Sequence, residues 1–319
     1  MREYIIRRLL LNIPVLLLVL IAVFSIMRIV PGDVVEQMLE EAGGSAQDQQ
    51  EQYDRLKAEL GLDKPIHIQF AQYLGGLVRG QWGRSLWSDR PVLEEIVMRL
   101  PVTIELGVLA IIMSAVMAIP LGVVAAIYQD SLWDYITRVI SVSALSIPSF
   151  WTATMVLIFP AIWWHYAPPV AYQAPWEDLS ENLRHVLVPA FLLGAILMGT
   201  VSRMTRSTLL EVIRQDYIRT ARAKGLRERV VIARHAMKNA MIPVLTVMGL
   251  QFSIVIGGTV IIETIFTLPG VGRLMVESII RNDYPQLQGN VLFIAGWILA
   301  VNLAVDLTYS WLDPRIRYR

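Results

Sequence analysis

The side chains that most often perform chemistry in proteins are few and scattered in this sequence. It contains no cysteine, which excludes disulfides, thiol catalysis, and zinc or iron–sulfur sites held by thiolates. The four histidines, His67, His165, His185 and His235, lie far apart in the chain and form no HExxH pair. We therefore predict that the chain holds no metal.

The motifs of phosphate-binding and nucleophilic enzymes are also missing. A P-loop requires Gly-Lys-Ser/Thr, and none of the four lysines follows a glycine. The segment nearest to a GxSxG nucleophile elbow, Gly83-Arg84-Ser85, continues with leucine and tryptophan. No carboxylate pair and no Ser–His pairing stands out within the apolar stretches. The sequence therefore predicts that the chain alone is not an enzyme and cannot hydrolyse ATP through a P-loop.

The segment from 203 to 240 concentrates basic side chains and holds ten of the 28 Lys and Arg residues. Within it, Asp216–Leu226 is rich in alanine and long basic residues, which favour a helix, and Gly225 suits the position just after a helix end. One interpretation is a basic loop that binds anionic lipid, to which each cation contributes roughly 1 kcal/mol. The other is a short helix between two membrane spans, on which a partner could push. Lipid contact requires neither the alanines nor the glycine, so these residues favour the second interpretation.

Four polar residues at bilayer depth are candidates for lining a solute pathway. Gln251 and Ser253 lie in the fifth apolar stretch, and Ser146 and Ser149 lie at a break in the third. Polar residues in membrane helices usually face the bundle interior. The alternative is helix packing for Gln251 and Ser253, and satisfaction of backbone groups freed near Pro148 for the two serines.

The elements that must position these residues are membrane helices. Apolar residues make up 55% of the chain and charged residues 17%, against about 45–50% and about 25% in soluble domains. A bilayer core of about 30 Å requires about 20 apolar residues per helix. Six stretches satisfy this length, namely 9–30, 102–128, 135–164, 186–202, 241–262 and 291–312. The sequence thus predicts an all-α polytopic membrane protein with six transmembrane helices.

Basic residues fall mainly on one side of these stretches. The N-terminus, the 128–138 loop, the 203–240 segment and the tail hold 17 of the 28 Lys and Arg residues. The positive-inside rule therefore predicts that both termini and the 203–240 segment are cytoplasmic. An even number of spans agrees with this orientation.

We expect three parts along the chain. Residues 1–30 form an N-terminal transmembrane helix, 31–100 an extracytoplasmic loop or cap, and 101–319 a five-helix core that includes the 203–240 loop. The first apolar run is longer than the 7–15 residues of a signal-peptide core, and no A-x-A site follows it. We therefore expect it to be retained as an anchor.

The 216–226 segment carries a family resemblance. Thr220-Ala221-Arg222-Ala223-Lys224-Gly225, with Pro243 eighteen residues beyond the glycine, resembles the EAA loop of ABC importer permeases, in the form found in dipeptide, oligopeptide and nickel importers. Where the wider superfamily has glutamate, this chain has Thr220, a departure shared by the peptide-type branch. Further stretches agree along nearly the whole chain, namely Leu60–Pro65, Arg99–Leu106, Ser146–Trp151, Glu263–Arg273 and Asp313–Ile316.

This resemblance implies a type I ABC importer permease fold with a small extracytoplasmic insertion between helices 1 and 2. It also implies a set of partners in the prokaryotic inner membrane: a second homologous permease, two ABC ATPases that carry ATP and Mg²⁺, and an extracytoplasmic solute-binding protein. No cofactor on this chain and no nucleic acid is implied. Residues 217–226 would be the helix that couples the permease to an ATPase. The coupling residues would be Tyr217, Thr220, Ala221, Arg222, Ala223, Lys224 and Gly225.

The rival interpretations are a stand-alone secondary transporter or channel, whose basic loop only binds lipid, and an intramembrane hydrolase. The first lacks inverted-repeat halves and paired ionisable residues within the spans, and the second lacks a nucleophile–base pair. The sequence leaves the solute open among dipeptides, longer peptides, glutathione-like molecules, nickel chelates and oligosaccharides.

Overall fold

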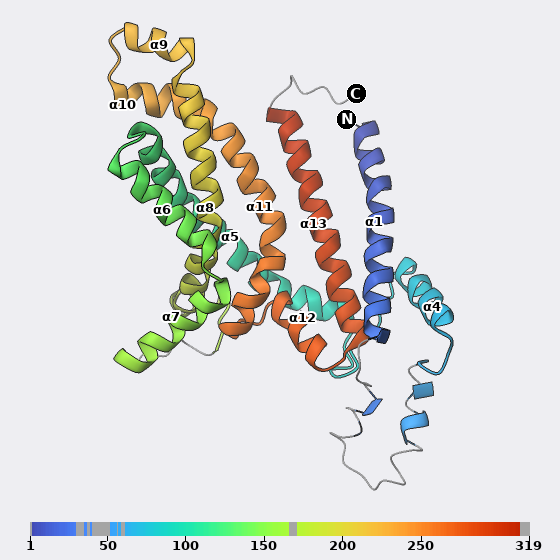
Figure 1. The fold of residues 1–319 in the computed structure, drawn as a ribbon. Coiled ribbons are helices and arrows are strands. Elements are labelled where there is room, and N and C mark those ends of the chain that lie inside the picture. The colour runs from blue at the N-terminus through green and yellow to red at the C-terminus, as the bar shows by residue number, and fades with distance from the viewer. Residues whose placement is uncertain are drawn as a thin grey trace. The chain divides into compact units, whose positions relative to one another are not determined.

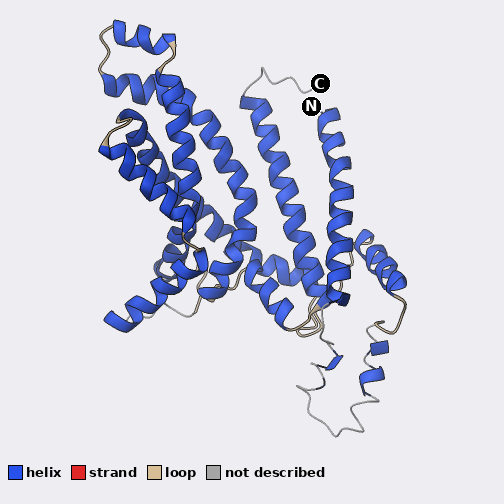
Figure 2. Cartoon of the chain, viewed as in Figure 1, coloured by secondary structure: helices blue, strands red, loops and turns tan. Residues whose placement is uncertain are grey.

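The computed structural model describes residues 2–29, 35–36, 39, 52–55, 57–58, 61–165 and 171–312. These residues are almost entirely helical, and their only β-type pairing outside helices is an isolated bridge between Arg84 and Pro91 (Figure 2). The all-α prediction is therefore confirmed. Much of the first outer loop before residue 61, the centre of the second outer loop and the Asp313–Ile316 motif lie outside the described residues.

Four described helices are long and apolar enough to cross a bilayer, and two bent helix pairs raise the number to six if each pair is one span. The single helices are α1 (Arg2–Ile29), α5 (Val92–Ile127), α8 (Leu179–Ile213) and α13 (Tyr284–Leu312) (Figure 1). The pairs combine α6 (Leu132–Ser146) with α7 (Ser149–Trp164), and Glu228–Ser253 with Val255–Ile265, the second pair containing most of α11 (Met237–Ile265). This agrees with the six predicted stretches.

Several helices are longer than the apolar stretches that predicted them. The second span begins at Val92 rather than at Val102, the fourth runs from Leu179 to Ile213 rather than from 186 to 202, and the sixth begins at Tyr284 rather than at 291. Apolarity marks the part that matches the bilayer, whereas backbone hydrogen bonding continues through Glu, Arg, Leu and Gln, which are good helix formers. The predicted bounds were therefore too short at these ends.

The break in the third span lies where the sequence placed it. α6 ends at Ser146, α7 begins at Ser149, and the two helices meet at 95°. Ile147 has ψ 126°, since the ring of Pro148 disfavours helical geometry in the residue before it. Proline therefore ends α6 and starts α7.

The chain divides into two compact units. The first, unit 1, comprises residues 1–101 and 273–297, and the second, unit 2, comprises 102–272 and 298–319. Unit 1 contains α1, α4 (Ile66–Val78), the beginning of α5, most of α12 (Val271–Ile280) and the first half of α13. Residues 273–297 thus belong to the same compact unit as the N-terminal part of the chain. The predicted division, by contrast, placed them with the 101–319 core, because it followed the order of the sequence.

Unit 2 is built around α8, which packs against α6, α7 and α11. Glycines allow close helix contacts here: a Cβ on Gly194 would lie 2.7 Å from the Ala110 carbonyl oxygen, and one on Gly199 would lie 2.5 Å from that of Ser141. α9 (Asp216–Ala223) follows α8 and lies beyond its end, and α10 (Glu228–Val230) follows α9 (Figure 1). A π-helical segment, Val231–Ala236, then leads into α11.

Candidate functional site

The 216–226 segment contains a short helix of eight residues, α9. Asp216 lies in its first turn and Arg222 in its last, where their charges favour the helix dipole. Gly225 adopts φ +76°, a left-handed conformation that glycine adopts without strain, and reverses the chain there. The predicted stop is confirmed, although the helix spans 216–223 rather than 217–226.

α9 has an inner and an outer face. Ile218 is fully buried and Ala221 is 7% exposed, and both pack into an apolar cluster with Leu209, Val231 and Ala236. The outer face presents the other six predicted coupling residues: Tyr217, Thr220, Arg222, Ala223, Lys224 and Gly225 are all exposed. Within this chain Ala221 therefore anchors the helix, and a coupling role for it stays a prediction. The three-residue spacing of Ile218 and Ala221 is the sequence signal that could have revealed the anchoring.

Two polar contacts connect α9 with the segments that follow it. Asn239 at the start of α11 donates to the Tyr217 hydroxyl at 2.8 Å. Arg222 forms a two-pronged ion pair with Glu228 of α10 at 2.6 and 3.1 Å. α8 ends only three residues before α9 begins, so the link between these two helices is short, whereas residues 224–236, which include α10 and the π-helical segment, separate α9 from α11.

A buried ion pair connects α6 to α8 in the same unit. Asp134 is fully buried and accepts two bonds from Arg206, at 2.8 and 2.9 Å, and one from the Asp130 backbone N–H at 3.0 Å. Arg138 approaches the same carboxylate at 3.3 Å. Arg206 lies two turns before the end of α8, so the pair attaches α6 to α8 close to the point where α9 begins. Sequence reasoning missed it, because the two partners are 72 residues apart.

The four candidate pathway residues have the following contacts. Gln251 is 8% exposed and donates to the Leu197 carbonyl of α8 at 3.2 Å, and Ser253 donates to Asn302 of α13 at 2.8 Å. Both therefore form helix-to-helix hydrogen bonds. Ser146 is exposed and donates to the Val142 carbonyl at 2.9 Å, and Ser149 is half-buried at the start of α7. A pathway role for these residues stays a prediction.

The Glu263–Arg273 motif forms a tight corner at the end of α11. Glu263 is fully buried and accepts from Thr103 of α5 at 2.8 Å, while the Thr103 hydroxyl accepts from the Val271 N–H at 2.9 Å. A Cβ on Gly270 would collide with the Glu263 carboxylate, and one on Gly272 would lie 2.6 Å from the Val260 Cα. The two glycines are thus required for the chain to wrap around this carboxylate.

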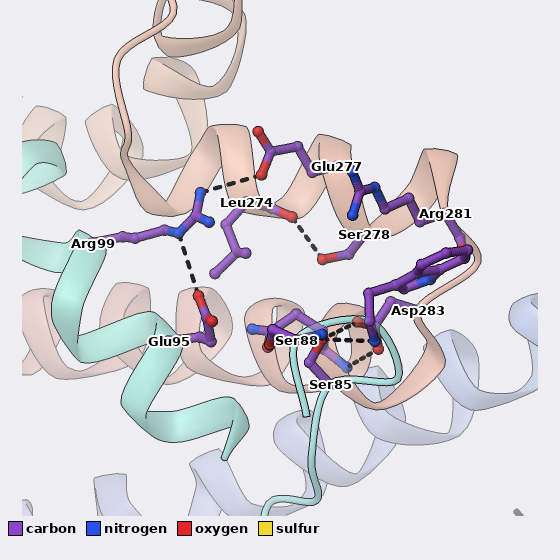
Figure 3. A pocket seen from close by; sticks show the side chains of 11 residues that line it. Ser85, Ser88, Glu95, Arg99, Leu274, Glu277, Ser278, Arg281 and Asp283 are labelled. Atoms are coloured by element: carbon purple, nitrogen blue, oxygen red, sulfur yellow. Dashed lines mark hydrogen bonds and ion pairs between the residues drawn. The ribbon is translucent and has the colours of Figure 1, made fainter. Parts of the chain in front are cut away.

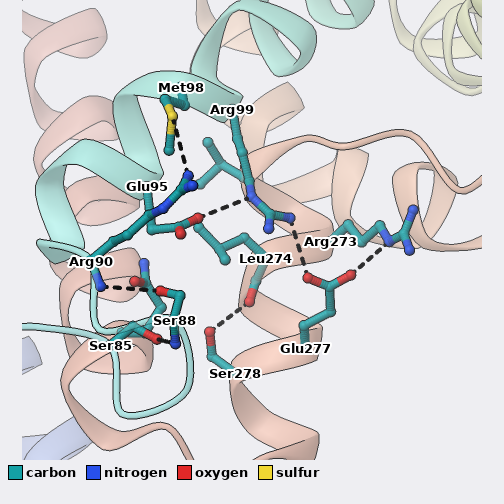
Figure 4. Close-up of polar contacts among 12 residues, drawn as sticks. Ser85, Ser88, Arg90, Glu95, Met98, Arg99, Arg273, Leu274, Glu277 and Ser278 are labelled. Atoms are coloured by element: carbon teal, nitrogen blue, oxygen red, sulfur yellow. Dashed lines mark hydrogen bonds and ion pairs between the residues drawn. The ribbon is translucent and has the colours of Figure 1, made fainter. Parts of the chain in front are cut away.

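Unit 1 contains a polar cavity of about 290 Å³ between the 85–88 turn, the start of α5, α12 and the start of α13 (Figure 3). Arg99 contacts Glu95 at 3.6 Å and Glu277 at 3.2 Å, and Glu277 also pairs with Arg273 at 2.8 Å (Figure 4). These alternating charges connect α5 to α12.

Asp283 closes the other side of this cavity. It accepts from the Ser85 hydroxyl at 2.6 Å and from the backbone N–H groups of Leu86 and Gln286, both at 3.2 Å. It therefore caps α13 and fixes the 85–88 turn. Burial raises the pKa of the Asp283 carboxyl, and the hydrogen bond from Ser85 opposes this shift.

Comparison with known families agrees with this architecture. The family model for the binding-protein-dependent transport system inner membrane component matches residues 118–318, and the model for the N-terminal part of the same component matches 1–107. The chain belongs to this family. It is therefore a membrane permease component of a transport system, and the family is not one of enzymes.

Individual relatives extend over the whole chain. It is 39% identical to the dipeptide transport system permease protein DppB of Escherichia coli K12, over 100% of both chains. It is also 39% identical to the protein of the same name in Alkalihalophilus pseudofirmus, again over 100% of both. Among solved structures, an amino acid ABC transporter crystallised with histidines matches 70% of this permease and 95% of its own chain, with a TM-score of 0.51 and 12% identity. That likeness shows a common fold.

Proposed function

We propose that this permease forms half of the translocation pathway of an ATP-driven importer of peptides. The transport role follows from the family, and the peptide class is supported by the relatives named as dipeptide permeases. In this proposal a second homologous permease completes the pathway, two ATPases bind below and carry ATP and Mg²⁺, and a solute-binding protein delivers the peptide from outside. Both termini and α9 lie on the cytoplasmic side, since 17 of the 28 basic residues gather there.

The observation that carries the coupling proposal is the two-faced geometry of α9. Its inner face is fixed in the core by Ile218 and Ala221, while its outer face is exposed and basic. A partner seated on the outer face would displace α9 as one body, because Asn239 and Glu228 hold it to the segments after it. The displacement would reach α8 through a short link, α11 through the hydrogen bond between Asn239 and Tyr217, and α6 through Asp134 and Arg206. Coupling between distant sites requires such a mechanically connected element.

Charge substitution on the two faces tests this proposal. Ala223→Glu changes only the exposed face, so we expect the purified complex to keep its thermal stability and lose most of its peptide-stimulated ATP hydrolysis and its ATP-dependent uptake. Ala71→Glu, on an exposed alanine of α4, is the matched control and should leave both activities unchanged. Ala221→Asp places a charge in the core and should lower stability as well.

Affinity purification from native membranes tests the assembly. Recovery of a second permease, two ATPases and a binding protein supports it. A chain that purifies alone and moves solute in vesicles without ATP, or an Ala223→Glu variant with undiminished uptake, contradicts the proposal and favours a lipid-binding loop on a stand-alone transporter.

A further inference from the structure

A second cavity of unit 1, of about 240 Å³, lies between the end of α1, α4, the 82–86 loop and the start of α13. Aromatic side chains line much of it: Phe24, Tyr73, Trp82 and Tyr284. The Phe24 ring stacks on Tyr73 with centroids 6.2 Å apart. Gln72, which is exposed, also lines it.

Three buried hydrogen-bond donors without a protein acceptor belong to residues that line this cavity. They are the Arg28 Nη1 group, the Tyr73 hydroxyl and the Gln288 Nε2 group, and Gln288 is only 5% exposed. Burial raises the pKa of Tyr73 to about 12, so its hydroxyl stays protonated at neutral pH. Within the described ranges, the buried side-chain carbonyl oxygens left without a donor, on Asn182 and Gln286, do not line this cavity. An oxyanion only accepts hydrogen bonds and can accept one from each of these three groups, of which only the Tyr73 hydroxyl could also accept one.

Arg28 also supplies a positive charge. No carboxylate of the described residues lies within ion-pair distance of its guanidinium, and Glu36 and Asp63 line a neighbouring cavity together with it. Its Nε and Nη2 groups donate to Gln69 Oε1 at 3.3 and 2.8 Å, and the Gln69 amide is oriented by donation to the carbonyls of Leu62 and Lys64. The guanidinium lies 4.3 Å from the Phe24 ring centroid and 5.2 Å from that of Tyr284. These contacts hold the cation in place but do not cancel its charge. The guanidinium is therefore preorganised for an anion.

The position of the cavity identifies the anion that reaches it. Arg28 is one residue from the end of α1, and Gln288 lies in the second turn of α13, so the cavity sits where two membrane helices end. α4 is only 13 residues long, has no fully buried residue and exposes Ile66 and Val78, as interfacial helices do. Phosphate head groups occupy this level of a bilayer.

We propose that this cavity binds the phosphate group of a phospholipid, held by Arg28, Tyr73 and Gln288. The lipid would fix α4 against α1 and α13. None of the residues that line this cavity belongs to α9 or to the four candidate pathway residues.

Lipid titration of the complete, delipidated transporter tests the proposal, with phosphatidylglycerol as the probe and native mass spectrometry as the readout. Arg28→Gln should raise the dissociation constant of the most tightly bound phosphatidylglycerol about 10- to 100-fold, the range expected for losing charge-assisted hydrogen bonds. Tyr73→Phe removes one hydroxyl with little change in shape and should raise this dissociation constant by about tenfold or less. Gln288→Glu replaces a donor with a negative charge and should raise the dissociation constant at least as much as Arg28→Gln does.

The matched control is Arg281→Gln. Arg281 lies over the Trp87 ring at 5.4 Å and does not line this cavity, so its loss should leave the tightest lipid in place. Equal lipid affinity in the parent, Arg28→Gln and Tyr73→Phe proteins overturns the proposal. Inorganic phosphate at millimolar concentration tests a soluble ligand in place of the lipid. If phosphate raises the unfolding temperature of the parent but not of the Arg28→Gln protein, and phosphatidylglycerol raises neither, the phospholipid assignment is wrong.

Discussion

The ion pair between Asp134 and Arg206 makes a quantitative prediction about burial. Two ion pairs in this chain have nearly the same geometry: Asp134–Arg206, with contacts of 2.8 and 2.9 Å, and Glu228–Arg222, with contacts of 2.6 and 3.1 Å. Their exposure differs. The side chains of the first pair are 0% and 23% exposed, and those of the second are 53% and 40% exposed. Changing each arginine to glutamine therefore compares the stability that a buried and an exposed ion pair of similar geometry contribute.

The expected magnitudes follow from solvation. Arg206→Gln leaves a buried carboxylate without its main partner, and removing one partner of a buried pair costs about 3–5 kcal/mol of unfolding free energy. We expect the lower end, about 3 kcal/mol, because Arg138 and the Asp130 N–H still contact Asp134. Arg222→Gln removes an exposed pair and should cost about 0–1 kcal/mol.

Reversible unfolding of the purified permease in mixed micelles, with increasing denaturing detergent, measures both changes. A double-mutant cycle with Asp134→Asn and Arg206→Gln should give a coupling energy of about 2 kcal/mol or more, since the two residues share one network. Arg138→Gln, whose side chain is 43% exposed, is the internal control and should cost about 1 kcal/mol or less. If Arg206→Gln and Arg222→Gln cost the same, burial does not decide the strength of these pairs and the reasoning is refuted.

Two further predictions concern the corner at Glu263 and the cap at Asp283. Gly272→Ala should cost about 1–3 kcal/mol in the same unfolding assay, because the added methyl group would lie 2.6 Å from the Val260 Cα and 2.9 Å from Glu263 Oε2. Gly257→Ala, which meets no atom within 4 Å, should be neutral or stabilising, and equal losses in the two variants would contradict the crowding argument. For Asp283, a folded-state pKa above the ordinary 3.8 means that the native state loses stability as the pH rises through that raised value. The Asp283→Asn variant cannot ionise, so its unfolding temperature should rise relative to that of the parent protein as the pH is raised above 3.8, and a relative fall would show that the direction of the pKa shift is wrong.

The features that sequence reasoning predicted are those governed by local interactions. Long apolar runs predicted the membrane helices because each helix satisfies its own backbone hydrogen bonds and needs only a matching apolar length. Pro148 predicted the break between α6 and α7, and Gly225 predicted the end of α9, since both residues act on their immediate backbone. The helix ends were less predictable, because charged helix formers extend α5 and α8 beyond the apolar stretches.

Long-range packing decided the rest. Asp134 and Arg206 are 72 positions apart in the sequence, and Thr103 and Glu263 are 160 positions apart, so no local spacing predicts either contact. The same holds for Arg28 and Gln288, which line one cavity from opposite parts of the chain. The sequence by itself determined the family, the membrane spans and the short basic helix. Only the tertiary structure decided where the buried charges find partners, because that depends on which helices lie beside one another.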